Sequence, residues 1–372
     1  MRSDMADLLL LSTQKSMLIS GDKAGLSQAF LSGDKGFPRY LLGRNEHAKA
    51  LASLVKIDGI IDDFFSGKNW NDLPIIKGED VPKDAIVVNC SMSISPLSAS
   101  RRLESIGLDK CLNYSDLLRT FCNLVAVPEF VRDMRNDYAA YPEKWKALPS
   151  LFADPESRSV FDDVVSYRLT ADPNLMSKYS VRFSDQYFEE FLHLSEEVFI
   201  DAGGYNGDTS EEFCKRYSDY RKVILFEPSL PNMLEAKKRL APYRDIEFFN
   251  QGISDASGFL WFNPDAGSAC AVSDSGSCRI DVTTLDNAIP GCISFIKMDL
   301  EGWELKALNG ARRHIRENHP KLAISVYHTA ADFWRVPEFI LSIREDYDIY
   351  LRHYTEGWSE TVMFFVPVVK ND

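Results

Sequence analysis

The segment FIDAGGYNGDT, residues 199–209, decides the fold of the second half of this chain. It begins as an apolar strand, places Asp201 at the strand's carboxyl end, turns through three glycines and leads into a predicted helix. Glycines at such a turn let the backbone bend tightly and approach a ligand closely. In an open α/β sheet, ligands bind at the carboxyl ends of the strands. We therefore expect a ligand site at Gly203, Gly204 and Gly207.

From this segment to the C-terminus, strands and helices alternate. Strands are predicted at residues 198–201, 222–226, 246–250, 293–298, 323–327, 347–351 and 362–366, and helices at 208–217, 231–240, 304–317 and 337–344. Seven strands with helices between them predict a doubly wound α/β sheet. Residues 352–360 hold no helix-length apolar pattern, so we expect the last two strands to form a hairpin, which adds an antiparallel edge strand.

The first half predicts a smaller parallel α/β domain. Its strands are expected at residues 40–42, 57–61, 85–90 and 110–112, behind helices within residues 1–36. Between the two halves, helical periodicity rich in aromatic residues predicts a helical connector. The expected domains are therefore 1–125, 126–196 and 197–372, which suits a chain of 372 residues.

Composition restricts the partners. The formal net charge of −13 disfavours nucleic acid and anionic lipid surfaces as partners. No apolar run is long enough for a signal peptide or a membrane span, so we expect a cytoplasmic protein. Seven cysteines without a C-x-x-C pair argue against a disulfide framework and a structural zinc site. The sequence predicts no particular oligomeric state.

Two acids indicate the cofactor. Asp201 occupies the position of the first glycine of a dinucleotide fingerprint, where its charge would repel a phosphate but suit an ammonium group. Glu227 ends the next strand, where a carboxylate can accept both ribose hydroxyls of an adenosine. Taken alone, Asp201 could be a helix cap or a turn former, and Glu227 could be a solvated strand end. Together with the glycines they favour S-adenosylmethionine.

Four segments carry a resemblance to a known family. Residues 199–209, 226–228 (FEP), 296–304 (IKMDLEGWE) and 360–363 (ETVM) follow one another in the expected order. Residues 197–366 resemble the FkbM family of S-adenosylmethionine-dependent methyltransferases. The resemblance implies a set of cofactor-binding residues: Asp201, Gly203, Gly204, Gly207, Thr209, Glu227, Asn250, Gln251 and Gly252.

Candidate catalytic residues follow later strands. Asp299 and Glu301 come after the strand ending at Met298, and His328 follows the strand ending at Tyr327. They could hold an acceptor hydroxyl, act as a general base or bind a divalent cation together, although we assign no metal ligand. The alternative is that either acid caps the next helix.

Other candidates are weaker. His353 ends the next strand, and three tryptophans are expected near the same rim, as sugar-binding faces or as packing: Trp303, Trp334 and Trp358. Residues 267–277 predict a loop over the site or a surface insertion.

The function predicted from this sequence is O-methylation, with S-adenosylmethionine as the methyl donor. The resemblance implies a small-molecule or glycan acceptor, namely a sugar hydroxyl of a glycan, a glycolipid or a nucleotide-linked sugar. One alternative is a Rossmann-type oxidoreductase that uses the first domain, where Gly43 stands without the further glycines that a pyrophosphate needs. Another is a non-catalytic cofactor-binding scaffold.

Overall fold

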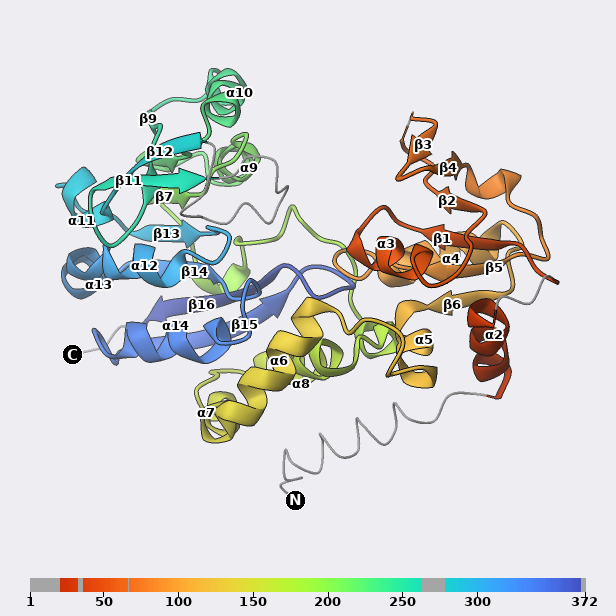
Figure 1. Cartoon of the computed structure of the whole chain (residues 1–372). Coiled ribbons are helices and arrows are strands. Elements are labelled where there is room, and N and C mark those ends of the chain that lie inside the picture. Colours follow the sequence, from red (N-terminus) through yellow and green to blue (C-terminus); the bar gives the residue numbers. More distant parts are fainter. Residues whose placement is uncertain (1–20, 33–35, 66, 263–277, 369–372) are drawn as a thin grey trace. The chain divides into compact units, whose positions relative to one another are not determined.

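The computed structural model describes residues 21–32, 36–65, 67–262 and 278–368 (Figure 1). These residues form two compact units. The first comprises the described residues up to Pro142, with Phe161–Val181 and Tyr354–Ser359; the second comprises Glu143–Val160, Arg182–His353 and the residues from Glu360. The predicted loop at 267–277 lies outside the described residues. Every described helix is too short or too polar to cross a lipid bilayer.

The first unit contains a six-stranded sheet with the order β3-β4-β2-β1-β5-β6. Its strands are β1 (Arg39–Leu42), β2 (Gly59–Ile61), β3 (Asn69–Trp70), β4 (Leu73–Ile76), β5 (Ile86–Asn89) and β6 (Cys111–Asn113). Its helices are α2 (Gly21–Leu31), α3 (Glu46–Ala52), η1 (Gly78–Asp80), α4 (Pro96–Ser105), α5 (Tyr114–Thr120), α6 (Glu129–Ala140) and η3 (Pro173–Met176). The predicted parallel α/β domain is present, although the sequence did not indicate β3, which is antiparallel to β4.

The predicted helical connector consists largely of helices and is divided between the two units. Its elements, besides α6 and η3, are α7 (Pro142–Ala147), η2 (Leu148–Ser150), α8 (Pro155–Thr170) and η4 (Glu190–Leu192). The boundary between the units falls within α8, so this helix contributes residues to both.

The second unit is built on a seven-stranded sheet with the order β15-β16-β14-β13-β7-β8-β9. Its strands are β7 (Val198–Ala202), β8 (Lys222–Phe226), β9 (Ile246–Phe249), β13 (Phe295–Met298), β14 (Lys321–Ser325), β15 (Tyr347–His353) and β16 (Thr361–Pro367). Its further helices are α9 (Asp208–Arg216), α10 (Leu230–Leu240), α11 (Leu285–Ala288), α12 (Glu304–Asn309), α13 (Arg312–Asn318) and α14 (Asp332–Leu341). The predicted doubly wound α/β class is confirmed.

The hairpin predicted for the last two strands is also present. Strand β16 is antiparallel to both β14 and β15, so it is the reversed strand and lies one place in from the edge. Because β16 runs backwards, its amino end lies at the same edge of the sheet as the carboxyl ends of β13 and β14. Glu360, which precedes β16, is thereby brought to that edge.

The structure differs from the sequence-based expectation in two places. The single helix expected over 304–317 is divided into α12 and α13 around Gly310, where an added Cβ would lie 2.0 Å from the carbonyl oxygen of Ser254. The sequence also did not indicate a separate three-stranded sheet, β10 (Gly252–Ile253), β11 (Gly258–Phe262) and β12 (Cys278–Thr283). Strand β12 pairs antiparallel with β11, and the sequence predicted neither of these strands.

Candidate functional site

The glycine loop after β7 is shaped by contacts within the protein. Gly203 has φ +80°, and an added Cβ would lie 2.0 Å from the carbonyl oxygen of Asp299. Gly207 has φ +81°, and its Cβ would lie 3.1 Å from the Cα of Ala236 in α10. At Gly204 a Cβ would overlap a leucine side chain of β8 at 2.4 Å. The loop can therefore lie this close to the sheet only with glycine at these positions.

Asp201 belongs to a buried ion pair. Its carboxylate is fully buried, accepting a 2.7 Å hydrogen bond from Ser210 Oγ and a 3.1 Å hydrogen bond from Lys297 Nζ. We expected this carboxylate to face the amino-acid end of a cofactor, but both of its oxygens are bound within the protein. Lys297 also donates to the carbonyl oxygen of Gly203 at 2.8 Å, so the pair holds the glycine loop.

The sequence reasoning missed Lys297. The signal was a lysine inside the apolar strand FIKM, where a charge is rarely buried without a partner. Strands β7 and β13 pair with Asp201 directly beside Lys297, which supplies that partner. Burial lowers the pKa of Lys297, but the Asp201 carboxylate outweighs this effect, and the net result is a raised pKa.

Glu227 lies at the carboxyl end of β8, beside the glycine loop. Its side chain is nearly buried, and its two oxygens accept hydrogen bonds from the backbone N–H groups of Tyr205, at 3.0 Å, and Ser229, at 2.8 Å. Burial raises the pKa of this carboxyl group. A carboxylate oxygen can accept more than one hydrogen bond, so this arrangement still allows Glu227 to accept bonds from ribose hydroxyls.

The remaining predicted cofactor residues surround this edge. The side-chain amide of Asn250 donates to the carbonyl oxygens of Glu227, at 2.8 Å, and Pro228, at 3.1 Å, and so ties the ends of β8 and β9 together. Gln251 is half-buried in the turn before β10, and Gly252 begins that strand. Thr209 is half-buried in the first turn of α9.

Asp299 lies at the carboxyl end of β13 and is held by two tyrosines. Tyr187 OH donates to Oδ2 at 2.8 Å, and Tyr327 OH donates to Oδ1 at 3.3 Å. Burial, followed by the charge of Asp299, raises the pKa of both tyrosines, so they remain protonated donors. The sequence reasoning missed Tyr187, which comes from the connector.

His328 stands among three carboxylates. Its Nε2 lies 3.5 Å from Asp299 Oδ1 and 3.4 Å from Glu301 Oε2, and its Nδ1 lies 3.1 Å from Glu304 Oε1. Burial lowers the pKa of His328, but the carboxylates of Glu301, Glu304 and Asp299 outweigh it, and the pKa lies well above its ordinary value. The three predicted catalytic residues are therefore brought together.

Two further acids of this edge were missed. Glu304 is fully buried and accepts a 2.6 Å hydrogen bond from the backbone N–H of Leu300. Glu360 accepts a 2.7 Å hydrogen bond from Gln186 Nε2, and burial together with the charge of Asp299 raises its pKa to about 7. Both acids were in motifs that the sequence singled out, but their positions in space depend on the ends of α12 and β16.

The weaker candidates have local structural roles. His353 is buried, with Nδ1 2.9 Å from Thr361 Oγ1 across the β15–β16 pair. The three tryptophans contact different neighbours: Trp303 donates to Ser254 Oγ, Lys144 and Arg335 lie over Trp334, and Trp358 stacks on Phe130 within the first unit.

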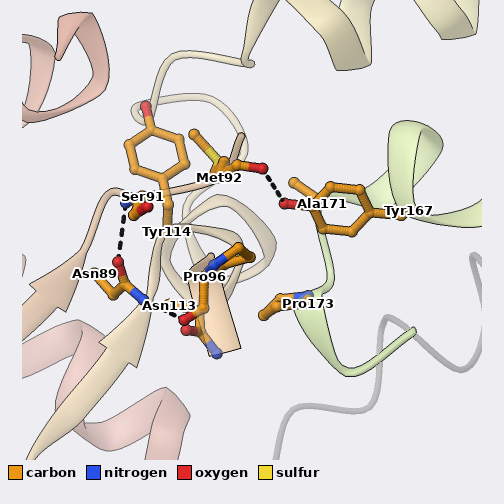
Figure 2. A pocket seen from close by; sticks show the side chains of 9 residues that line it. All are labelled: Asn89, Ser91, Met92, Pro96, Asn113, Tyr114, Tyr167, Ala171 and Pro173. Atoms are coloured by element: carbon orange, nitrogen blue, oxygen red, sulfur yellow. Dashed lines mark hydrogen bonds between the residues drawn. The ribbon is translucent and has the colours of Figure 1, made fainter. Parts of the chain in front are cut away.

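The first unit shows no nucleotide-sized cavity among its described residues at the carboxyl ends of β5 and β6. Figure 2 shows the pocket there, lined by Asn89, Ser91, Met92, Pro96, Asn113, Tyr114, Tyr167, Ala171 and Pro173. The space between its lining atoms, open solvent included, is about 170 Å³. Asn89 donates to the Pro96 carbonyl oxygen and accepts from the Ser91 N–H, so its polar groups are used within the protein.

The polar residues that follow Gly43 and strand β2 of this unit also make contacts within the protein. Asn45 caps α3 by accepting a hydrogen bond from the N–H of Ala48 at 3.0 Å. Asp62, at the end of β2, forms a 2.7 Å ion pair with Arg44 and accepts the N–H groups of two following residues. Asp62 stands where a dinucleotide domain has an acid that binds ribose, but here its carboxylate binds the loop that follows β2.

Comparison with known proteins agrees with the fold of the second unit. Residues 201–354 match the Methyltransferase FkbM domain model. The FkbM methyltransferase of Methylobacillus flagellatus KT is 26% identical, with a TM-score of 0.72 over 97% of this chain and 98% of that one. An rRNA methylase from Streptococcus thermophilus is 15% identical, with a TM-score of 0.33 over 48% of this chain and 93% of that one.

Fibrillarin from Aeropyrum pernix, solved with natively bound S-adenosyl-L-methionine, is 11% identical, with a TM-score of 0.30 over 46% of this chain and 67% of that one. No curated protein has a significant sequence match to the chain. The match of residues 201–354 to the FkbM domain model and the similarity to an FkbM methyltransferase over nearly the whole chain confirm the resemblance predicted from the sequence. The second unit is thus built on a methyltransferase domain.

Proposed function

We propose that the second unit transfers a methyl group from S-adenosylmethionine to an oxygen atom, and that the acceptor is a sugar hydroxyl of a glycan, a glycolipid or a nucleotide-linked sugar. The observation that carries this proposal is one continuous edge of the sheet. The glycine loop and Glu227 lie at the ends of β7 and β8, and the carboxylates around His328 lie at the ends of β13 and β14.

The first half of this edge suits an adenosyl ligand. Glu227 would accept hydrogen bonds from the ribose hydroxyls. Asn250, Gln251 and Gly252 would lie beside the adenine, and Thr209 would lie beside the glycine loop. Asp201 and Lys297 would act as positioning residues, because their ion pair fixes the carbonyl of Gly203 rather than reaching a ligand. The sulfonium of the cofactor supplies an electrophilic methyl group.

The second half of the edge suits a hydroxyl acceptor. Asp299 and Glu301 expose part of their carboxylates, which accept hydrogen bonds from hydroxyls strongly. The acceptor oxygen bonds to the methyl carbon as the methyl–sulfur bond breaks, and a carboxylate of this group takes the hydroxyl proton. Alignment of the two reactants is the main contribution that such a displacement needs. The net charge of −13 further supports an acceptor other than nucleic acid.

Isothermal titration calorimetry tests the cofactor assignment. Wild type should bind S-adenosylmethionine, and Glu227→Gln should bind it at least about tenfold more weakly, since hydrogen bonds to a charged acceptor contribute roughly 1.5–3 kcal/mol. The control Glu235→Gln, on the exposed side of α10, should match wild type. Binding of a nicotinamide dinucleotide in place of S-adenosylmethionine would favour the oxidoreductase alternative and refute the proposal.

An acceptor assay tests the chemistry. Wild type incubated with S-adenosylmethionine and a panel of free sugars, nucleotide sugars and glycolipids should form S-adenosylhomocysteine with members that carry free hydroxyls. Asp299→Asn should keep most of the cofactor affinity and lose turnover. Methylation confined to amines, or unchanged turnover of Asp299→Asn, would contradict the O-methyltransferase assignment.

A further inference from the structure

The carboxylates around His328 carry more negative charge than the neighbouring basic groups balance. Asp299, Glu301, Glu304 and Glu360 all act electrostatically on this histidine or on one another. Lys297 also interacts with Asp299 but is already paired with Asp201. Such an excess of buried or half-buried carboxylates needs either bound protons or a cation.

The distances from His328 Nε2 to two carboxylate oxygens suit a metal ion. His328 Nε2 lies 3.5 Å from Asp299 Oδ1 and 3.4 Å from Glu301 Oε2. An ion about 2.1 Å from each ligand sets neighbouring ligand atoms about 3.4 Å apart in tetrahedral geometry and about 3.0 Å apart in octahedral geometry. The observed separations fall close to the first value. A small movement of the Glu301 side chain, which is 40% exposed, would reach the second.

The burial of His328 Nε2 is independent evidence for a cation site. The His328 side chain is 8% exposed, and its Nε2 atom is buried without a hydrogen-bond partner of suitable geometry among the described residues. A buried imidazole nitrogen ordinarily has a partner. Here Nε2 points between two carboxylates, and a cation in that position would be its partner.

The opposite side of the ring has the arrangement found behind metal-bound histidines. A metal-ligating histidine usually directs its other N–H at a carboxylate, which fixes the ring and its tautomer. Glu304 Oε1 lies 3.1 Å from Nδ1, is fully buried and is fixed by the Leu300 N–H. Ligand atoms of Asp299, Glu304 and His328 all lie within 4.8 Å of one another.

We propose that His328 Nε2, Asp299 Oδ1 and Glu301 Oε2 bind one divalent cation, with Glu304 and Tyr187 as positioning residues behind His328 and Asp299. An imidazole with two carboxylates suits Mn²⁺, which accepts both nitrogen and oxygen donors, better than Mg²⁺, which prefers oxygen alone. Three protein ligands leave open coordination positions, as in catalytic metal sites.

The role of the cation rests on the proposed function, but its binding does not. Its open positions would be available to an acceptor with two neighbouring oxygens, and the ion would make an acceptor hydroxyl more acidic. We therefore expect the acceptor to be a compound with adjacent oxygens, such as a vicinal diol.

Titration of the metal-free full chain with Mn²⁺, followed by electron paramagnetic resonance of the free ion, tests the site. We expect one Mn²⁺ per chain, displaced more effectively by Zn²⁺ than by Mg²⁺. Glu301→Gln and His328→Asn should each weaken Mn²⁺ binding about 100-fold or more, and Glu304→Gln about 10–100-fold. Glu317→Gln, an exposed glutamate on α13, is the matched control and should bind as wild type does.

Parallel calorimetry with S-adenosylmethionine separates the two proposals. If Mn²⁺ does not bind, or binds equally well to Glu301→Gln, His328→Asn and the control, the cation site is refuted even when the cofactor binds normally. If Mn²⁺ binds as expected while S-adenosylmethionine does not bind, the cation site stands and the proposed function fails. Circular dichroism of each variant verifies folding, and Glu301→Gln, with its half-exposed side chain, keeps the test decisive should His328→Asn not fold.

Discussion

Replacing Lys297 with methionine tests the proposed link between the buried ion pair and the glycine loop. Lys297 and Asp201 have side chains that are 3% and 0% exposed, with 3.1 Å between Nζ and Oδ1. The same Nζ donates to the carbonyl oxygen of Gly203 at 2.8 Å. Methionine keeps most of the apolar volume of lysine, so the change removes a charge and three hydrogen bonds while leaving little cavity.

The expected loss of stability is large because Asp201 remains buried without its cation. Removing one partner of a buried pair costs about 3–5 kcal/mol, most of it from the uncompensated charge. A loss of that size lowers the folded-to-unfolded ratio roughly a hundredfold or more. Loosening of the Gly203 carbonyl should also weaken S-adenosylmethionine binding, even under conditions where the variant is fully folded.

Urea unfolding followed by circular dichroism, with the transition of the second unit fitted separately, measures this loss. The double variant Asp201→Asn/Lys297→Met removes both charges, and the oxygen of the introduced amide can still accept the hydrogen bond from Ser210. This double variant should therefore be more stable than Lys297→Met alone. A double variant no more stable than Lys297→Met would show that the buried charge is not the cause. A loss below about 1 kcal/mol in Lys297→Met would refute the reasoning altogether.

Three further changes address the loop, the packing and the site. Gly203→Ala should cost several kcal/mol in urea unfolding and abolish measurable cofactor binding, since its Cβ would lie 2.0 Å from the Asp299 carbonyl oxygen at φ +80°. Asp154 has its pKa lowered because Arg352 and Ser157 outweigh its burial; its stabilisation is therefore present above the unfolded-state pKa and lost as pH falls through the folded pKa. Asp154→Asn should be less stable than wild type at pH 7, and this difference should shrink towards pH 3. Tyr187→Phe should cost about 1 kcal/mol in stability and weaken Mn²⁺ binding by loosening Asp299.

The glycine change and the aspartate change each have a matched control. Gly258→Ala adds a Cβ with no atom within 4 Å, so it should leave both stability and cofactor binding near wild-type values. Asp348→Asn, an exposed change on β15, should show no pH-dependent difference from wild type. A Tyr187→Phe variant with unchanged Mn²⁺ affinity would remove that tyrosine from the site, and an Asp154→Asn difference that stays constant down to pH 3 would contradict the Arg352 contact.

The sheet of the second unit could be predicted because buried parallel strands are continuous apolar runs. Strands β7, β8 and β14 are interior runs of this kind, and the absence of a helix pattern in 352–360 correctly predicted the antiparallel β15–β16 hairpin. The division of the predicted helix 304–317 could not be read from periodicity. It depends on the approach of Gly310 to the Ser254 carbonyl, a contact between segments more than 50 residues apart.

The candidate site was predicted only in part. Residues that follow a strand can be recognised in the sequence, whereas the partner of a residue on the neighbouring strand cannot. Asp299, Glu301 and His328 follow their strands directly, so the topology brings them together. The role of Asp201 depends on the register of β7 against β13, which puts Lys297 beside it. No local sequence pattern contains that register, so the buried ion pair of Asp201 with Lys297 could not be predicted from the sequence.

Backbone strain gives an independent argument that the group around His328 is a built site. Tyr187, Glu301 and Glu360 have φ values of +74°, +53° and +67°, a conformation that side-chain-bearing residues rarely adopt. Each costs about 1–3 kcal/mol and persists only where surrounding contacts hold it. These residues come from three separate segments, yet all three side chains interact with Asp299 or His328. The contacts with Asp299 and His328 therefore help to hold these three residues in this conformation.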